Sequence, residues 1–169
     1  AGVIRVRAAG LSAAAKVNVS SAPANRELNF VNDVLPVLGR AGCNSGACHA
    51  KPEGQAGFKL SVFAYDPKSD YDAILKNSRG RRVVAGAPDA SLLLRKPTMD
   101  VNHGGGLRLR PESDGYRLLV EWIRQGMPYG RTNDAALTGI EGFPHERTYA
   151  KEATQRLLVR ARYSDGRAA

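Results

Sequence analysis

The fold class is decided by residues 30–49, which read FVNDVLPVLGRAGCNSGACH. In the first half of this stretch, apolar residues recur at the spacing of one helix face, at Phe30, Val34, Leu35, Val37 and Leu38. Proline is tolerated in a first helical turn, so Pro36 is compatible with a helix that begins near it. The stretch therefore predicts a short amphipathic helix that ends near Gly39 and leads into a cysteine-containing loop.

Cys43 and Cys48 are the only cysteines of the 169-residue chain, and His49 follows the second one directly. A c-type haem is held by two thiols, which form thioethers with its vinyl groups, and by a histidine that ligates the iron. The usual motif has two residues between the cysteines, whereas residues 44–47, NSGA, separate them here. These residues are small and turn-prone, so the additional ones can loop out. The motif predicts one covalent haem with His49 as proximal ligand.

Two other interpretations of the cysteine pair remain open. A disulfide between Cys43 and Cys48 would close a small loop, as in exported proteins, but it does not explain the adjacent histidine. A zinc ion could be held by both cysteines and His49, with His103 or His145 as fourth ligand. Structural zinc sites usually combine two similar ligand pairs, and this chain has one. Haem accounts for both cysteines and for the histidine.

Helical periodicity extends from Leu28 to about Gly130, and strand-like alternation occurs towards both ends of the chain. The clearest helix begins after Ser113, a favourable N-cap residue. Residues 1–24 and 133–169 alternate apolar and polar side chains, which predicts short strands. The helices are short and the loops long, so a large apolar cofactor would complete the core. We expect a mainly α domain at residues 25–132, with short β-strand segments at both termini.

Charge and hydropathy argue against two kinds of partner. The net charge of +9 comes from basic residues spread along the whole chain without a nucleic-acid-binding motif, so we expect no nucleic-acid partner. Arg79, Arg81 and Arg82 are candidates for pairing with haem propionates. No apolar run approaches the roughly 20 residues that cross a bilayer, so we expect no transmembrane segment in this fragment. The first residues, AGVIRVRAAG, indicate an excised or processed fragment.

Several ordered motifs carry a resemblance to a known family. They are FVNDVLPVLGRAGCNSGACH, GFKLSVFAYDP, AGAPDASLLL, HGGGLRL and LLVEWIRQGMP. Together they resemble the cytochrome c-like domains of planctomycete multidomain proteins, over roughly residues 29–130. The resemblance implies a class I-like cytochrome c fold around one haem c. It also implies electron transfer in the periplasm or another exported location, with an unknown redox donor and acceptor, by a module that is not itself an enzyme.

The two ends resemble parts of bacterial immunoglobulin-like domains of the Big_2 type. Residues 2–20, GVIRVRAAGLSAAAKVNVS, resemble the last strands of such a domain. Residues 143–167, FPHERTYAKEATQRLLVRARYSDGR, resemble the first strands of another. The resemblance implies that residues 1–24 end one domain and that residues 133–169 form a linker and the start of the next, within a large exported protein. Pairing of the two ends with each other is the alternative.

The sixth iron ligand has four candidates, Met99, His103, Met127 and His145. The resemblance implies that it lies in the long loop before the last helix, which contains Met99 and His103. His103 precedes the glycines at 104–106, which allow a backbone to pass close to a flat macrocycle. We therefore expect His103, with Met99 as runner-up, and a low-potential bis-histidine centre. An exchangeable sixth position would instead indicate a haem-based sensor or a peroxidase-like site.

Overall fold

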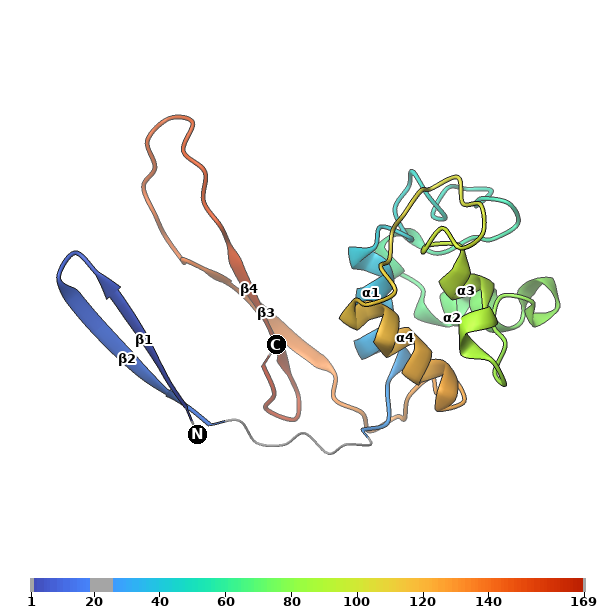
Figure 1. Cartoon of the computed structure of the whole chain (residues 1–169), viewed down its shortest axis with the longest axis horizontal. Helices are drawn as coiled ribbons and strands as arrows, with labels where there is room; N and C mark the ends of the chain where they lie inside the picture. Colours follow the sequence, from blue (N-terminus) through green and yellow to red (C-terminus); the bar gives the residue numbers. More distant parts are fainter. Residues whose placement is uncertain (1, 19–25, 169) are drawn as a thin grey trace.

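Helices make up 28% and strands 19% of the chain in the computed structural model, which describes residues 2–18 and 26–168. Within these described residues there are four α-helices and two small antiparallel sheets (Figure 1). The fold is therefore mixed, and the expected mainly α, class I-like cytochrome c fold is wrong. The reason is physical: the terminal strands form full two-stranded hairpins, whereas the helices between them are brief and joined by long loops.

The helices all lie in the middle of the chain. They are α1 (Leu35–Arg40), α2 (Pro67–Leu75), α3 (Leu92–Arg95) and α4 (Asp114–Arg124). A wider π-helical turn, Phe30–Val34, precedes α1, and 3-10 turns occur at Val62–Ala64, Asn77–Gly80 and Pro88–Ala90. As predicted, Ser113 caps α4, because its Oγ accepts a hydrogen bond from the Tyr116 N–H (3.2 Å). Among the described residues, no helix is both long enough and apolar enough to span a membrane.

An aromatic cluster forms the centre of the helical region. The ring of Phe30 is fully buried, with its centroid 5.2 Å from that of Tyr71 and 5.6 Å from that of Trp122. The ring of Tyr129 stacks on Phe30 at 5.9 Å. Trp122 is also fully buried, and its Nε1–H donates to Pro128 O (2.9 Å), so its one polar group is satisfied. The cluster joins the first turn, α2 and α4 into one core.

Truncation of this cluster should cost a large share of the stability. We expect Phe30→Ala to lower the free energy of unfolding by about 3–5 kcal/mol, because the buried ring would leave a cavity among three other aromatic rings. Tyr65→Ala is the matched control, since Tyr65 is 91% exposed and its loss should change stability by less than about 0.5 kcal/mol. Denaturant unfolding of the two variants checks this, and equal effects would contradict it.

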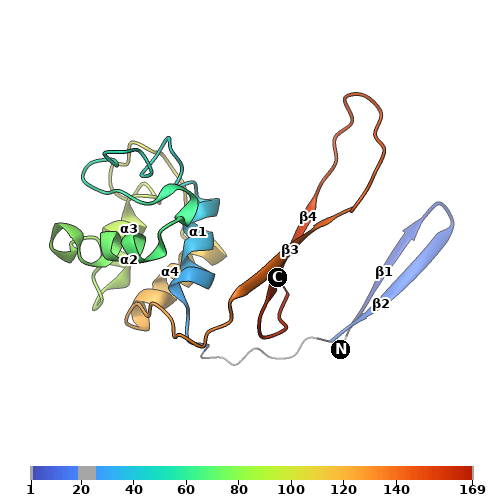
Figure 2. The ribbon, with the colours of Figure 1, turned by 180° about the vertical axis from the view of Figure 1, so that it is seen from behind.

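Each end of the chain forms its own antiparallel hairpin. β1 (Gly2–Ala8) pairs with β2 (Leu11–Val17), and β3 (Leu137–Phe143) pairs with β4 (Leu158–Tyr163). Within residues 2–18 and 26–168, no strand of one hairpin pairs with a strand of the other. Figure 2 shows both hairpins outside the helical region, and none of their strand residues is buried, most being exposed. The core is therefore confined to the helical region. The expected boundary after residue 24 lies outside the described residues.

Candidate functional site

The loop that follows α1 folds back on itself and carries both cysteines. The Cys43 N–H donates to Leu38 O (2.9 Å), which continues the end of the helix. The His49 N–H donates to Cys43 O (3.0 Å), so the chain returns to its starting point after the intervening residues. Residues 46–47 are exposed. Asn44 of the same loop is buried rather than looped out, so only residues 46–47 turn outward, and the loop brings Cys43 and Cys48 to the side of His49.

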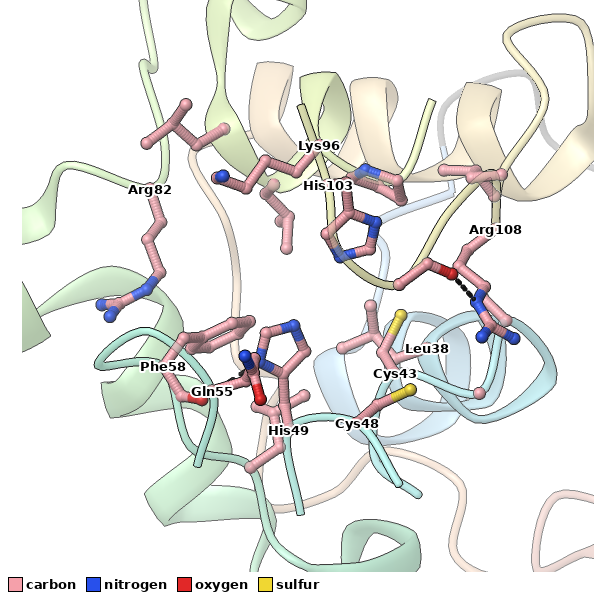
Figure 3. Close-up of a pocket in the computed structure, with 18 of the residues that line it drawn as sticks. Leu38, Cys43, Cys48, His49, Gln55, Phe58, Arg82, Lys96, His103 and Arg108 are labelled. Carbon is pink, nitrogen blue, oxygen red and sulfur yellow. Dashed lines mark hydrogen bonds between the residues drawn. The ribbon is translucent and has the colours of Figure 1, made fainter. Parts of the chain in front are cut away.

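A cavity of about 440 Å³ lies beside this loop, within the size range of small-molecule sites. Cys43, Cys48 and His49 line one side of it, and His103 lines the other (Figure 3). Its other walls are largely apolar and include Leu38, Phe58, Leu60, Leu93, Leu109 and Leu119. The structure therefore brings four residues singled out from the sequence to one cavity.

The imidazoles of His49 and His103 face each other across this cavity (Figure 3). Their ring centroids are 6.3 Å apart, and their planes differ by only 14°. His49 comes from the cysteine loop and His103 from the loop between α3 and α4, so residues far apart in the sequence form this pair. Two aligned imidazoles from separate loops are a suitable pair of ligands for one ion between them.

Each of the two imidazoles is oriented by a backbone carbonyl. His49 Nδ1 is 3.0 Å from Phe58 O, and His103 Nδ1 is 2.9 Å from Gly106 O. A carbonyl only accepts, so Nδ1 carries the hydrogen, and in the neutral ring Nε2 keeps a free lone pair. Burial is the largest cause of the lowered pKa of His49, which favours its neutral form. This hydrogen-bond pattern is typical of histidines that bind a metal through Nε2.

The glycines after His103 make room for its ring. A β-carbon at Gly105 would lie only 2.9 Å from His103 Cε1 and 3.2 Å from its Nε2. Gly106, whose carbonyl orients the ring, has φ +71°, a conformation that favours glycine. A β-carbon at Gly104 would meet nothing within 4 Å in the described structure. Gly105 therefore leaves space for the His103 ring, and Gly106 orients it through its carbonyl.

Basic side chains surround the cavity without acidic ones. The lining includes Lys51, Arg81, Arg82, Lys96 and Arg108, and of the described residues no aspartate or glutamate contributes to it. None of these five cations takes part in an ion pair within the described chain. Arg79, also expected near a propionate, is not part of the lining. A cavity of this composition favours a ligand with an apolar body and anionic groups.

Arg82 is held by the protein itself, which the sequence did not indicate. Its side chain is 5% exposed, and its terminal nitrogens donate to backbone carbonyls, including Gly57 O (2.6 Å), and to the Ser78 hydroxyl (3.1 Å). Its guanidinium also lies 4.6 Å from the centroid of the Phe58 ring. Because Phe58 O orients His49, Arg82 fixes the loop that positions this histidine. No local pattern marks Arg82 as buried, so the sequence predicts only that it pairs with a haem propionate.

Comparison with known proteins identifies no relative: the chain matches no protein family, no curated protein and no solved structure. The resemblance to planctomycete cytochrome c-like domains therefore stays a prediction that rests on the motifs quoted above. In the part of the chain that the structure describes, no three His, Cys, Asp or Glu side chains come together as a metal-ion site. A zinc site would need such a cluster, whereas a haem iron takes only two protein ligands.

Both cysteines are free thiols in this structure, so the disulfide alternative is not formed in it. Burial is the main cause that raises the pKa of Cys43 from 9.0 to about 11, and the neighbouring Cys48 adds to this effect. Arg108 acts in the opposite direction. The Cys43 thiol is therefore protonated and poorly nucleophilic near neutral pH in the haem-free protein.

This raised pKa has two measurable results in the haem-free protein. We expect alkylation of Cys43 at pH 8 to be about tenfold slower than for a thiol of pKa 9.0, because a thiolate fraction about a hundredfold lower is partly offset by the higher nucleophilicity of a more basic thiolate. The Cys43 thiol loses its proton near pH 9.0 in the unfolded chain and only near pH 11 in the folded chain. The free energy of unfolding therefore falls as the pH rises through that interval, by at most about 2 kcal/mol. Cys43→Ala should lack this loss when unfolding is compared at pH 8 and pH 11; an equal loss would contradict the assignment.

The remaining candidate ligands lie elsewhere. Met99 is 45% exposed and is not among the residues that line the cavity. Met127 packs against the hydrophobic core. His145 lies in the connection between β3 and β4, where its ring contacts Phe143 (4.6 Å). Of the four candidates for a sixth ligand, only His103 faces His49.

Proposed function

We propose that the helical region binds one haem c, held by thioethers to Cys43 and Cys48 with His49 and His103 as axial ligands, and that it transfers electrons. The observation that carries this proposal is the pair of facing imidazoles, each with Nδ1 bonded to a carbonyl and Nε2 left for a metal. The cysteine loop beside His49 supplies the two thiols at one edge of the same cavity.

The separation of the two histidines supports ligation of one iron between them. A histidine nitrogen binds a metal at about 2 Å, and a ring centre lies about 1 Å from its Nε2, so two imidazoles on opposite sides of one metal have centroids about 6 Å apart. The centroids of His49 and His103 are 6.3 Å apart. This separation therefore matches two imidazoles that would ligate one iron between them.

The charge around the cavity fits the acidic groups of a haem. Vinyl and propionate groups lie at opposite edges of the macrocycle, so thioethers at the cysteines direct the propionates to the far side of the histidine pair. Lys96 and Arg82 lie on that side (Figure 3), and Arg81 is the exposed neighbour of Arg82 in the lining. The Arg82 guanidinium already donates to backbone carbonyls of the protein. Arg81 and Lys96 are therefore the propionate partners in this proposal.

A filled sixth position favours electron transfer over the alternative functions. When bound, the haem would supply a one-electron redox couple, with a potential that is lower for a second histidine than for methionine. His103 would fill the position that a sensor or a peroxidase-like site would leave exchangeable. We therefore propose an electron-transfer module rather than an enzyme, located in the periplasm or otherwise exported, with its redox donor and acceptor unknown.

Intact mass and optical spectra of the protein, produced with a haem-attachment system, test the proposal. We expect denatured protein to retain the mass of one haem, and the oxidised and reduced spectra to be those of a low-spin bis-histidine centre. A polypeptide mass that fits a Cys43–Cys48 disulfide would overturn it in favour of a structural module. A high-spin spectrum with carbon monoxide binding at native pH would overturn the electron-transfer assignment in favour of a sensor or peroxidase-like site.

A further inference from the structure

We infer that two buried residues of opposite charge, Asp70 and Arg82, are positioning residues for the proximal ligand, because they fix the two ends of the segment that holds His49. This inference rests on the proposed function, in which His49 ligates the iron. We call Asp70 and Arg82 the proximal clamp, and the segment that they hold is residues 57–61. Asp70 is 1% exposed and lies outside the cavity lining, so its role is not contact with a bound group.

Residues 57–61 contact His49 through both its side chain and its backbone. Phe58 O lies 3.0 Å from His49 Nδ1, and the Leu60 N–H donates to His49 O (2.9 Å). The Phe58 ring also lies against the imidazole, with the two centroids 4.5 Å apart. A shift of this segment would therefore change the backbone position, the ring orientation and the hydrogen-bonded tautomer of His49 together.

Arg82 holds the first residue of this segment and ties it to the end of α2. The four hydrogens of its two terminal nitrogens have four acceptors, which are the carbonyls of Gly57 (2.6 Å), Ala73 (2.9 Å) and Asn77 (2.8 Å) and the hydroxyl of Ser78 (3.1 Å). Figure 3 shows the Phe58 ring between Arg82 and His49. A planar guanidinium serves acceptors in several fixed directions, which the ammonium group of a lysine cannot reproduce.

Asp70, which lies in α2, holds the last residue of the segment. One of its carboxylate oxygens accepts from the Ser61 N–H (2.5 Å) and the other from the Ser61 hydroxyl (2.8 Å). No ion pair of the described residues includes Asp70. A buried carboxylate without a cation needs hydrogen bonds to offset its loss of hydration, and both bonds here go to one residue. The structural effect of Asp70 is therefore to fix Ser61.

The proximal clamp acts on His49 and not on His103. The plane of His49 differs by only 14° from that of His103, whose ring is oriented separately by Gly106 O. In a low-spin ferric haem, the angle between two axial imidazole planes shapes the EPR signal: near-parallel planes give a rhombic signal, and near-perpendicular planes give a highly anisotropic one. The clamp would therefore fix the tautomer that offers Nε2 to iron and also the near-parallel arrangement of the rings.

Two substitutions disturb one end of the clamp each. Arg82→Lys keeps the charge but loses the planar fork, and Asp70→Asn keeps the size but leaves one oxygen acceptor in place of two. Arg79→Lys is the matched control for the first, since Arg79 is exposed and outside the cavity lining. Asp72→Asn is the control for the second, since Asp72 lies in the same helix and pairs with the exposed Lys68.

Nitrogen NMR of the haem-free proteins, at a pH at which both imidazoles are neutral, reads the tautomers of His49 and His103 directly. We expect the ratio of the Nδ1–H to the Nε2–H form of His49 to fall about tenfold in each clamp variant, as for the loss of one hydrogen bond, and to stay unchanged in the controls. His103 should not change in any of them, whereas general loosening of the fold would affect both rings. An unchanged His49 in a folded clamp variant would overturn the inference.

Milder substitutions decide the question if a clamp variant does not fold. Ser61→Ala removes one contact of Asp70, and Ser78→Ala removes one contact of Arg82. Each should lower the same tautomer ratio of His49 about threefold, because part of the clamp remains. No change in either variant would overturn the inference.

EPR spectra of the oxidised, haem-loaded proteins connect the clamp to the proposed function. We expect a rhombic low-spin signal from the wild type and the controls, and an added highly anisotropic component from both clamp variants. Haem content is measured first. Absence of haem from the wild type would contradict the proposed function, whereas the NMR result on the haem-free protein would still decide the role of the clamp. A rhombic signal that is unchanged in both clamp variants would overturn the inference and leave the proposed function intact.

Discussion

Replacement of both Cys43 and Cys48 by alanine is expected to abolish covalent haem attachment completely while leaving haem bound. Without the two thiols no thioether can form, so denatured protein should have the mass of the polypeptide alone. The facing imidazoles of His49 and His103 do not depend on the thiols, since backbone carbonyls hold both rings. The native protein should therefore still bind added haem and show a low-spin spectrum. Intact mass before and after denaturation, with the optical spectrum, measures both parts.

Ser45→Ala is the matched control for the cysteine variants. Ser45 lies in the same loop, and its hydroxyl donates to Gly42 O (2.9 Å), so the substitution changes the loop without removing a thiol. We expect this control to retain the covalent haem, and each single cysteine variant to retain one thioether. If the double variant still carried haem after denaturation, or if both cysteines of the haem-loaded wild type reacted with an alkylating reagent, the assignment of the thiols would be wrong.

His103→Ala is expected to convert the haem site from low spin to high spin. The substitution removes the only candidate sixth ligand that faces His49, so one coordination position would open to exogenous ligands. Carbon monoxide should then bind nearly all of the reduced variant and almost none of the reduced wild type. The covalent haem should remain, because Cys43, Cys48 and His49 are unchanged. Optical spectra with and without carbon monoxide provide the measurement.

Met99→Ala serves as the control for the sixth ligand. Met99 lies in the same long loop as His103 but is exposed and outside the cavity lining, so its loss should leave the low-spin spectrum intact. The reverse outcome, with a spectrum that survives His103→Ala and is lost in Met99→Ala, would show that methionine is the ligand. It would also raise the expected reduction potential.

The sequence could predict the local parts of the site because each depends on neighbouring residues. The exposed turn at residues 46–47 follows from small, turn-prone residues, although Asn44 of the same loop is buried, and the cap at Ser113 follows from its position before an apolar periodic run. The glycines after His103 are a local signal too, but their main contact in the structure is the histidine ring. The expectation that they clear space for a macrocycle stays a prediction.

Other features depend on contacts between distant segments, and local patterns do not reveal them. Arg82 stands in a run of exposed basic residues, yet its guanidinium binds carbonyls of two other segments and is buried. The predicted mainly α fold class is wrong for a related reason. Alternation predicts that strands exist, but the extent of β1–β2 and β3–β4 depends on cross-strand pairing, which is not a property of either strand alone.

The close approach of Gly105 to the His103 ring makes this backbone position a constraint on sequence variation. Any other amino acid would place a carbon 2.9 Å from the imidazole and force it to move. A saturation library selected for the intact haem spectrum should therefore recover glycine alone at position 105, whereas the surfaces of the hairpins should accept many residues. In homologous chains, co-occurrence of a glycine two residues after such a histidine would mark the ligand even where the rest of the loop has diverged.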